Sequence, residues 1–292
     1  MRSFKDYNPI AVFLFFLGVI VPSMFIMDPV LLCISLGGAC ALHFTLNGRS
    51  GFKGFWLFPV VVLAGLILNP LFNHNGATVL FVLNNNPVTA EAAMYGLTMG
   101  IMISGVLLWF RSFTQIMTSD KLLYIFGAVS PKLALILSMV LRYIPLFRRQ
   151  ITKTNQAQKA MGLYKEENTI DKLKGGMRIF SVMVTWALEN GVITADSMTA
   201  RGYGVGRRSQ FALFKWRKSD KIFLLVTLAC VGVVIWAISA KAVGYTFYPK
   251  LIPTKASVPG FCGYIVYAVL AVIPVFITVK EVKQWQSLQS KI

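Results

Sequence analysis

The sequence predicts an all-α, polytopic membrane protein with about six, and up to eight, transmembrane helices and a cytoplasmic domain of long amphipathic helices. Of its 292 residues, 56% are hydrophobic and 14% are charged, whereas soluble domains carry about 25% charged residues. The mean hydropathy is +0.64, and several apolar stretches approach the roughly 20 residues that a helix needs to cross a bilayer. This composition excludes an ordinary soluble enzyme, and the 13% of aromatic residues exclude a disordered chain.

The first apolar stretch is interpreted as a transmembrane helix rather than a cleaved signal peptide. Arg2 and Lys5 precede it, but it lacks a small-residue cleavage site, and a second apolar stretch follows directly after Asp28-Pro29. Similar stretches recur along the chain. The predicted spans are residues 10–27, 29–46, 55–70, 93–110, 222–240 and 261–280.

The distribution of basic residues predicts the orientation. Lys and Arg number 29 against 11 acidic residues, and the segment 111–221 alone holds 19 basic and 7 acidic residues, a balance of +12. The connection 71–92 has no Lys or Arg, and 241–260 has three. Because cytoplasmic loops carry the excess of Lys and Arg, both termini and the basic segment are expected in the cytoplasm.

The predicted organisation has three parts. Residues 1–110 form N-terminal transmembrane helices with the external loop 71–92, residues 111–221 form a cytoplasmic and membrane-interfacial domain, and residues 222–292 form C-terminal transmembrane helices. Within the external loop, Thr78 to Leu83 is expected to be a strand, and we favour a plug or hairpin that covers helix ends over a solute site.

Inside the basic segment, residues 122–147 are apolar enough to add one or two membrane helices, with breaks at Pro131 and Pro145. Two amphipathic helices follow, from about Arg142 to Met161 and from about Met177 to Arg201, joined by a turn at Gly175-Gly176. Such helices need a surface to lie against: each other, the membrane or a partner protein.

Two smaller patterns lie at the edges of this organisation. The basic and aromatic stretch 207–218 is interpreted as an interfacial helix that meets anionic lipid, rather than as a nucleic-acid site. The four cysteines lie in apolar stretches without C-x-x-C spacing, so we expect buried, unpaired thiols. They are Cys33, Cys40, Cys230 and Cys262.

Several kinds of chemistry have no signature in the sequence. There is no phosphate-binding G-x-x-x-x-G-K-[ST] loop, no H-E-x-x-H and no G-x-S-x-G, so we expect no catalytic residues, no metal site and no directly bound cofactor. The predicted spans contain no acidic residue, and their single basic residue is Lys280 at the boundary of the last span. A carrier that moves its own coupling ion usually keeps ionisable groups at membrane depth, so these spans argue against a proton-coupled carrier.

Two short triplets end the amphipathic helices. The second helix ends in Ala200-Arg201-Gly202, and the first ends in the similar Ala160-Met161-Gly162. Arg before a capping Gly is typical of an ordinary helix C-terminus. It also suits a docking site, because small neighbours allow close approach and a guanidinium binds acidic groups as a bidentate donor.

With these helices, the external loop and the triplets in this order, nearly the whole chain resembles the transmembrane T component of energy-coupling factor (ECF) transporters, which import vitamins and metals into prokaryotes. The resemblance implies a multi-pass protein of the prokaryotic plasma membrane that binds two ABC-type ATPases and a membrane-embedded, substrate-binding S component. It implies that ATP is used by the ATPases, and that this chain is not itself an enzyme.

Carried over to this sequence, the resemblance makes 111–221 a coupling domain. It assigns ATPase docking to Ala200, Arg201 and Gly202 at one end and to Ala160, Met161 and Gly162 at the other. Met161 stands where the family usually has Arg, so it fills an apolar groove but makes no charge-assisted pair. Lys159 or Lys165 is expected to supply the missing charge. Either the two ATPases differ, with one adapted to Met161, or this end docks more weakly, and we favour the hetero-pair.

Two other functions stay open at this point. A self-contained permease needs clustered polar groups inside the spans, which are missing. A membrane scaffold or insertase would use the basic segment on ribosomes or RNA. The transported solute is not encoded here, because in this family the S component selects it.

Overall fold

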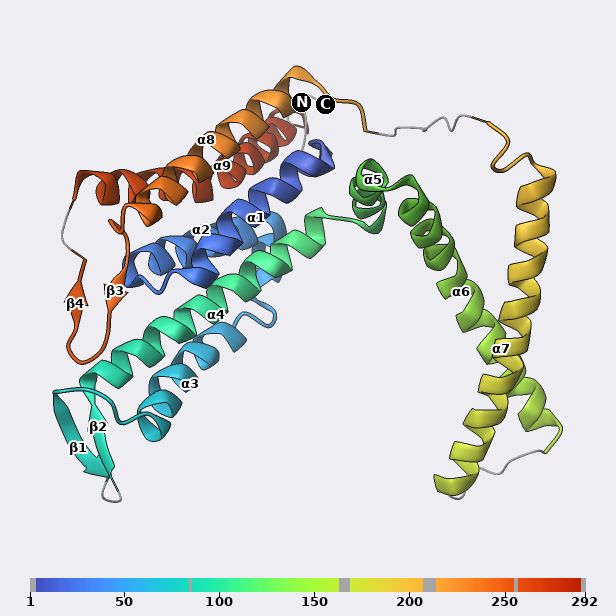
Figure 1. Ribbon diagram of the computed structural model, residues 1–292, viewed down its shortest axis with the longest axis horizontal. Coiled ribbons are helices and arrows are strands. Elements are labelled where there is room, and N and C mark those ends of the chain that lie inside the picture. The colour runs from blue at the N-terminus through green and yellow to red at the C-terminus, as the bar shows by residue number, and fades with distance from the viewer. Residues whose placement is uncertain (1–3, 84–85, 163–168, 207–213, 255–256, 290–292) are drawn as a thin grey trace. The chain divides into compact units, whose positions relative to one another are not determined.

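The computed structural model describes residues 4–83, 86–162, 169–206, 214–254 and 257–289. The chain forms two compact units: Met1–Leu122 with Phe214–Ile292, and Leu123–Leu213. The protein is an all-α polytopic membrane protein, as predicted, with two small antiparallel hairpins beside the helices (Figure 1). We call the first unit the membrane unit and the second the helix-pair unit.

The membrane unit contains six apolar helices at the positions of the six predicted spans. They are α1 (Pro9–Phe25), α2 (Pro29–Asn47), α3 (Leu57–Phe72), α4 (Ala90–Ile116), α8 (Lys218–Ser239) and α9 (Val258–Gln289). In the described part of the chain, α2, α4, α8 and α9 are long and apolar enough to cross a membrane, whereas α1 and α3 are apolar but have 17 and 16 residues.

Side-chain caps and prolines explain where the first helices begin. The Asn8 side chain accepts from the backbone N–H of Ile10, and Asp28 accepts from the N–H groups of Val30 and Leu31. In both helices proline is the first residue after the cap. Backbone N–H groups in the first turn of a helix have no acceptor within the helix, so the missing N–H of proline costs no hydrogen bond there. At the start of α8, the N–H of Arg217 donates to the Asp220 carboxylate over 3.1 Å.

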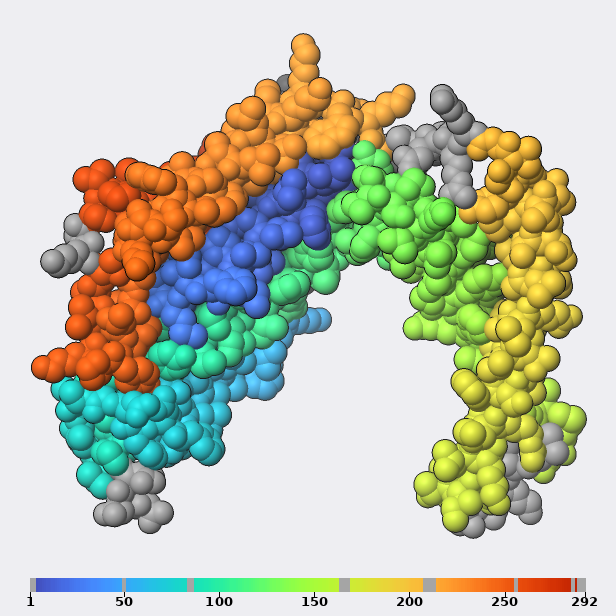
Figure 2. All heavy atoms as spheres, viewed as in Figure 1, coloured from blue at the N-terminus to red at the C-terminus, as the bar shows by residue number. Residues whose placement is uncertain are grey.

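Five helices of the membrane unit pack around one core. Contacts run from α1 to α8, α9, α2, α4 and back to α1, and α3 lies outside this ring against α4. The space-filling view shows α8, α1 and α4 side by side on one face (Figure 2). Trp109, Tyr267, Phe15 and Leu42 are fully buried, and a buried polar pair lies among them, since Trp109 Nε1 donates to Ser35 Oγ over 3.1 Å.

Asp28 ties the turn between α1 and α2 to a distant part of the chain. The side chain is 2% exposed. Besides its cap bonds, its second carboxylate oxygen accepts from the N–H of Gly244 at 3.2 Å and from the Tyr264 hydroxyl at 2.6 Å. A buried carboxylate with four donors is well compensated, so Asp28 is a structural group.

The hairpins are β1 (Val79–Leu83) with β2 (Asn86–Thr89), and β3 (Tyr245–Thr246) with β4 (Ile252–Pro253). The predicted strand at 78–83 is confirmed as β1. Its base is held at α4, where the Glu91 carboxylate accepts from the N–H of Thr78.

The helix-pair unit corrects the predicted helix boundaries. It contains the end of α5 (Ser119–Val129), α6 (Pro131–Ala160) and α7 (Thr169–Ala200). Pro131 does start a helix, but α6 continues through Pro145, so the expected start at Arg142 was wrong. The expected turn at Gly175-Gly176 was also wrong, because α7 runs through both glycines. A glycine inside a helix costs about 1 kcal/mol, which a continuous apolar face outweighs.

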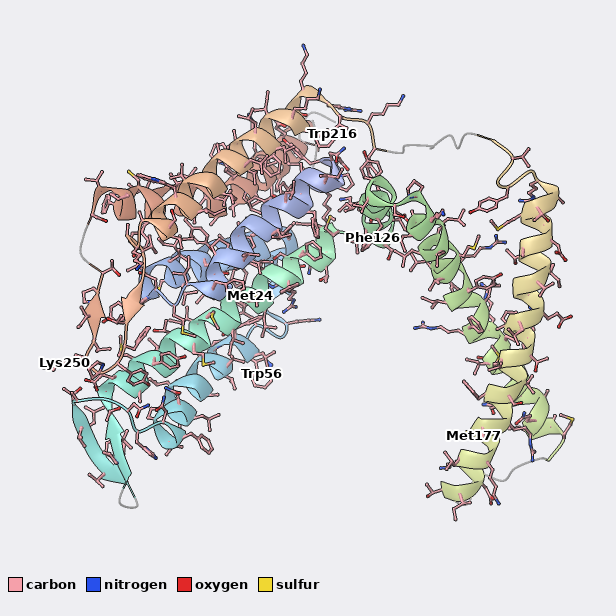
Figure 3. All side chains as sticks on the ribbon, in the orientation of Figure 1. Met24, Trp56, Phe126, Met177, Trp216 and Lys250 are labelled. Carbon is pink, nitrogen blue, oxygen red and sulfur yellow. The ribbon has the colours of Figure 1, made fainter. Side chains whose placement is uncertain are left out.

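Two further predictions need correction. The proposed interfacial helix 207–218 lies partly outside the described residues; of its described part, 214–218, only Lys218, the first residue of α8, is helical. Trp216, labelled in Figure 3, is 39% exposed there. The cysteines are unpaired, but Cys33 and Cys262 are exposed and the other two are half-buried. Hydropathy does not separate a core-facing position from a lipid-facing one, because both are apolar.

Candidate functional site

The triplet Ala200-Arg201-Gly202 forms the capped end of α7. Ala200 is the last helical residue, and Gly202 takes a left-handed conformation with φ +78°. The N–H of Gly202 donates to the carbonyl of Thr199 at 2.9 Å, and the N–H of Tyr203 donates to that of Met198 at 3.0 Å. These two bonds define a Schellman cap, in which Arg201 is the C-cap residue.

The triplet Ala160-Met161-Gly162 shares the helix end, the left-handed glycine and the glycine N–H bond of this cap at the end of α6. Ala160 is the last helical residue, Met161 is the C-cap, and Gly162 has φ +65°. The N–H of Gly162 donates to the carbonyl of Lys159 at 3.0 Å, matching the bond that Gly202 makes. Both glycines are needed for their positive φ, since an added Cβ at either would meet open space but a strained backbone.

All six triplet residues are exposed, and Met161 is 65% exposed. Within the part of the chain that the structure describes, the Arg201 guanidinium makes no hydrogen bond or ion pair. An exposed Arg beside two small residues is available to a partner as a bidentate donor. Lys159, a predicted support, is also exposed, and it is already engaged in an interaction within the chain. Lys165, the other predicted support, lies outside the described residues.

The two triplets lie at opposite ends of one crossed helix pair. The Tyr143 hydroxyl of α6 and Thr194 Oγ1 of α7 are 2.7 Å apart, and the rings of Phe147 and Trp186 meet edge to face at 5.4 Å. Helices α6 and α7 are therefore antiparallel where they cross (Figure 1). At 1.5 Å per residue, Met161 lies about 24 Å and Arg201 about 17 Å from the middle of these contacts, in opposite directions.

One apolar stripe of α7 stays exposed although α6 and α7 pack together. Its side chains recur at three- and four-residue steps and are 42–69% exposed. Met177, on this stripe, is labelled in Figure 3. Ile170 and Leu173 were not predicted to belong to it, because the turn expected at Gly175-Gly176 made the predicted helix begin only at Met177. The stripe consists of Ile170, Leu173, Met177, Phe180, Val184, Leu188 and Val192.

The geometry thus offers two exposed, equivalently capped helix ends and an apolar stripe between them. The family model described as CbiQ, cobalt transport protein, matches residues 6–213, a range that includes both triplets. The chain belongs to the CbiQ family. This assignment confirms the resemblance to T components that the sequence indicated.

Curated relatives of this CbiQ-family chain carry the name energy-coupling factor transporter transmembrane protein EcfT. The relative from Listeria innocua is 30% identical over 198 residues, 62% of this chain and 71% of the relative. The relative from Streptococcus equi subsp. equi is 28% identical over 243 residues, 78% and 84% of the two chains. A third, from Bacillus selenitireducens, is 26% identical over 224 residues, 71% and 82% of the two chains. The CbiQ-family chain is therefore a membrane component of an ECF-type transporter.

Proposed function

We propose that this chain is the transmembrane coupling subunit of an ECF importer that takes up a vitamin or another micronutrient. In this role it transmits ATP-driven motion from two ABC-type ATPases to an S component. ATP is bound and hydrolysed by the ATPases, and this chain catalyses no reaction. The observation that carries the proposal is the repetition of one exposed cap geometry at both ends of the crossed pair α6–α7.

Each helix end docks one ATPase in this proposal. Arg201 supplies a charge-assisted contact, and Met161 supplies an apolar one at the equivalent C-cap position. Two different side chains on the same backbone favour two different ATPases, a hetero-pair in which one groove is acidic and the other apolar. Truncating or reversing one partner of a buried charged contact costs about 2–5 kcal/mol, which is a weakening of about 30-fold or more.

The test compares full-length wild type with Arg201→Glu by tagged pull-down from solubilised membranes of the native host. Wild type should recover two P-loop ATPases and a small membrane protein, and Arg201→Glu should lose one ATPase. Arg149→Glu, a charge reversal at an exposed position on α6, is the matched control and should lose neither. The coupling role would be refuted if wild type were recovered alone, or if Arg201→Glu left its partners unchanged. The self-contained permease or the scaffold would then be the better interpretation.

Met161→Arg separates a hetero-pair from two equal ATPases. With an apolar groove at this end, the new charge is buried without a partner, and the second ATPase should bind more weakly. With an acidic groove like the one proposed for Arg201, the same substitution should strengthen binding. Weaker binding supports the hetero-pair, and stronger binding contradicts it.

The exposed stripe of α7 is the proposed contact for the S component. An apolar stripe about 30 Å long exceeds the single exposed side chains that are normal on a protein surface. Leu188→Glu should release the small membrane protein while both ATPases stay bound. Lys172→Glu, also exposed on α7, is the control, and loss of the ATPases with Leu188→Glu would place the stripe in the ATPase interface instead.

A cytoplasmic location for both termini and for the helix pair completes the proposal, and it rests on the excess of Lys and Arg in 111–221. Reporter fusions at the C-terminus and at an insertion within 84–85 should report opposite sides of the membrane. The same side for both would reject the orientation.

A further inference from the structure

The short 3-10 helix η1 (Phe4–Asp6) is bonded to the end of α4 through a buried lysine. Lys121 is 7% exposed, and its Nζ donates to the backbone carbonyls of Lys5 and Ile116, the second at 2.8 Å. Ile116 is the last residue of α4, where a cation is favoured by the exposed helix carbonyls. The bond to Lys5 joins residues 116 positions apart, so it is a tertiary contact and not part of the helix cap.

The same 3-10 helix is packed against α8 through aromatic rings. Phe4 is 1% exposed, and its ring lies 5.8 Å from that of Phe223 in α8 and 5.9 Å from that of Phe15 in α1, both edge to face. Tyr7 adds a second ring 5.3 Å from Phe223. Edge-to-face pairs of this kind stabilise a contact beyond the apolar area that they bury.

These two contacts lie at the two places where the chain passes between the units. The chain leaves the membrane unit after Leu122, next to Lys121, and returns at Phe214, nine residues before Phe223. We propose that η1 is a brace: through Lys121 and Phe4 it connects the segment that leaves the membrane unit at the end of α4 with the segment that returns to it in α8. Movement of the helix-pair unit is then transmitted to α4 and α8 together. Lys121 is then a positioning residue for coupling, and this inference rests on the proposed coupling function.

The ammonium of Lys121 is well suited to such a joint. It has three donors and no acceptor, so it binds two backbone carbonyls at once and depends on no particular side chain. Burial lowers the pKa of Lys121 from its ordinary 10.5, while the nearby Asp6 acts in the opposite sense. Methionine has a similar length and no donor, so Lys121→Met removes the bonds and keeps most of the volume.

The first measurement asks whether the brace exists. Hydrogen–deuterium exchange on the full complex should show faster exchange in residues 4–12 and 117–123 for Lys121→Met and for Phe4→Ala. Lys221→Met and Phe25→Ala are matched controls, since Lys221 is exposed and Phe25 is 82% exposed. The double variant should change exchange by less than the sum of the single variants, because both act on one turn.

The second measurement asks whether the brace transmits motion, with ATP as the only added probe. Spin labels at Phe110→Cys in α4 and Leu225→Cys in α8, in a background without the native cysteines, report a distance within the membrane unit. In wild type this distance should change on addition of Mg-ATP. In Lys121→Met the shifted fraction should fall about tenfold, with ATP hydrolysis by the complex retained, and Lys121→Arg, which keeps the donors, should restore it.

The outcomes are distinct. An unchanged ATP response in Lys121→Met, or an equal loss in Lys221→Met, overturns the brace while the proposed function stands. Faster exchange with a normal ATP response makes η1 a purely structural element and also overturns the inference. A wild-type chain that recovers no ATPase removes the proposed function itself, and the inference with it.

Discussion

Replacing Gly96 with alanine should drive α3 and α4 apart. A Cβ at Gly96 would lie 2.2 Å from the carbonyl oxygen of Gly65 and 2.7 Å from Cβ of Asn69. Replacing Gly65 with alanine would likewise place a Cβ 2.6 Å from the carbonyl oxygen of Gly96. Backbone atoms cannot yield as a flexible side chain does, so the helices must separate by about 1 Å. Overpacking of this kind costs about 1–3 kcal/mol.

The higher helix propensity of alanine offsets part of this overpacking cost, because it favours the substitution by up to about 1 kcal/mol. Gly37→Ala in α2 supplies the reference for this propensity, because a Cβ there meets nothing within 4 Å. Thermal unfolding in one detergent should give a midpoint for Gly96→Ala several degrees below that of Gly37→Ala. Equal midpoints, or a higher one for Gly96→Ala, would refute the close packing of α3 on α4.

Three further predictions concern other parts of the molecule. Asp28→Asn puts an amide donor either against the N–H of Gly244 and the hydroxyl of Tyr264 or, in the flipped orientation, against the N–H groups of Val30 and Leu31, and should lower the free energy of unfolding by about 1.5–3 kcal/mol in denaturant titrations; an unchanged midpoint would contradict the buried network. Gly202→Ala strains the left-handed cap by about 1–2 kcal/mol and should weaken ATPase recovery, whereas the helical Gly176→Ala should not; recovery that is equal for both would show that the cap is dispensable. The lowered pKa of Lys121 means that the unfolded chain holds this proton to higher pH than the folded protein does. The free energy of unfolding of wild type should therefore rise relative to that of Lys121→Met as the pH increases toward 10.5, and a pH-independent difference in a denaturant series would contradict it.

Local signals allowed much of the fold to be predicted. The pairs Asn8-Pro9 and Asp28-Pro29 place a capping side chain before a proline at N1, so the starts of α1 and α2 follow from neighbouring residues alone. The turn-forming asparagines beside Thr78 to Leu83 indicated the strand β1 in the same way. The glycines of both triplets were also recognisable as helix ends, and the structure places each at the same cap position.

The errors arose where tertiary context outweighed a local rule. Pro145 and Gly175 both favour a break, yet the apolar faces of α6 and α7 continue through them. The contacts of Lys121 with Lys5 and of Asp28 with Gly244 were not predictable, because they join residues 116 and 216 positions apart. Only the three-dimensional packing of α1, α4 and α8 brings these groups together.

The equivalence of the two caps sharpens what the difference between Met161 and Arg201 means. At both helix ends the N–H bond of the left-handed glycine holds the turn, and the C-cap side chain takes no part in that bond. A change at that one position therefore alters the docking chemistry without altering the fold of either helix end. The exchange Met161→Arg with Arg201→Met consequently isolates the side chain: if each ATPase follows its side chain to the other helix end, the side chain selects the partner, and if each ATPase stays in place more weakly bound, the surrounding helix surface does.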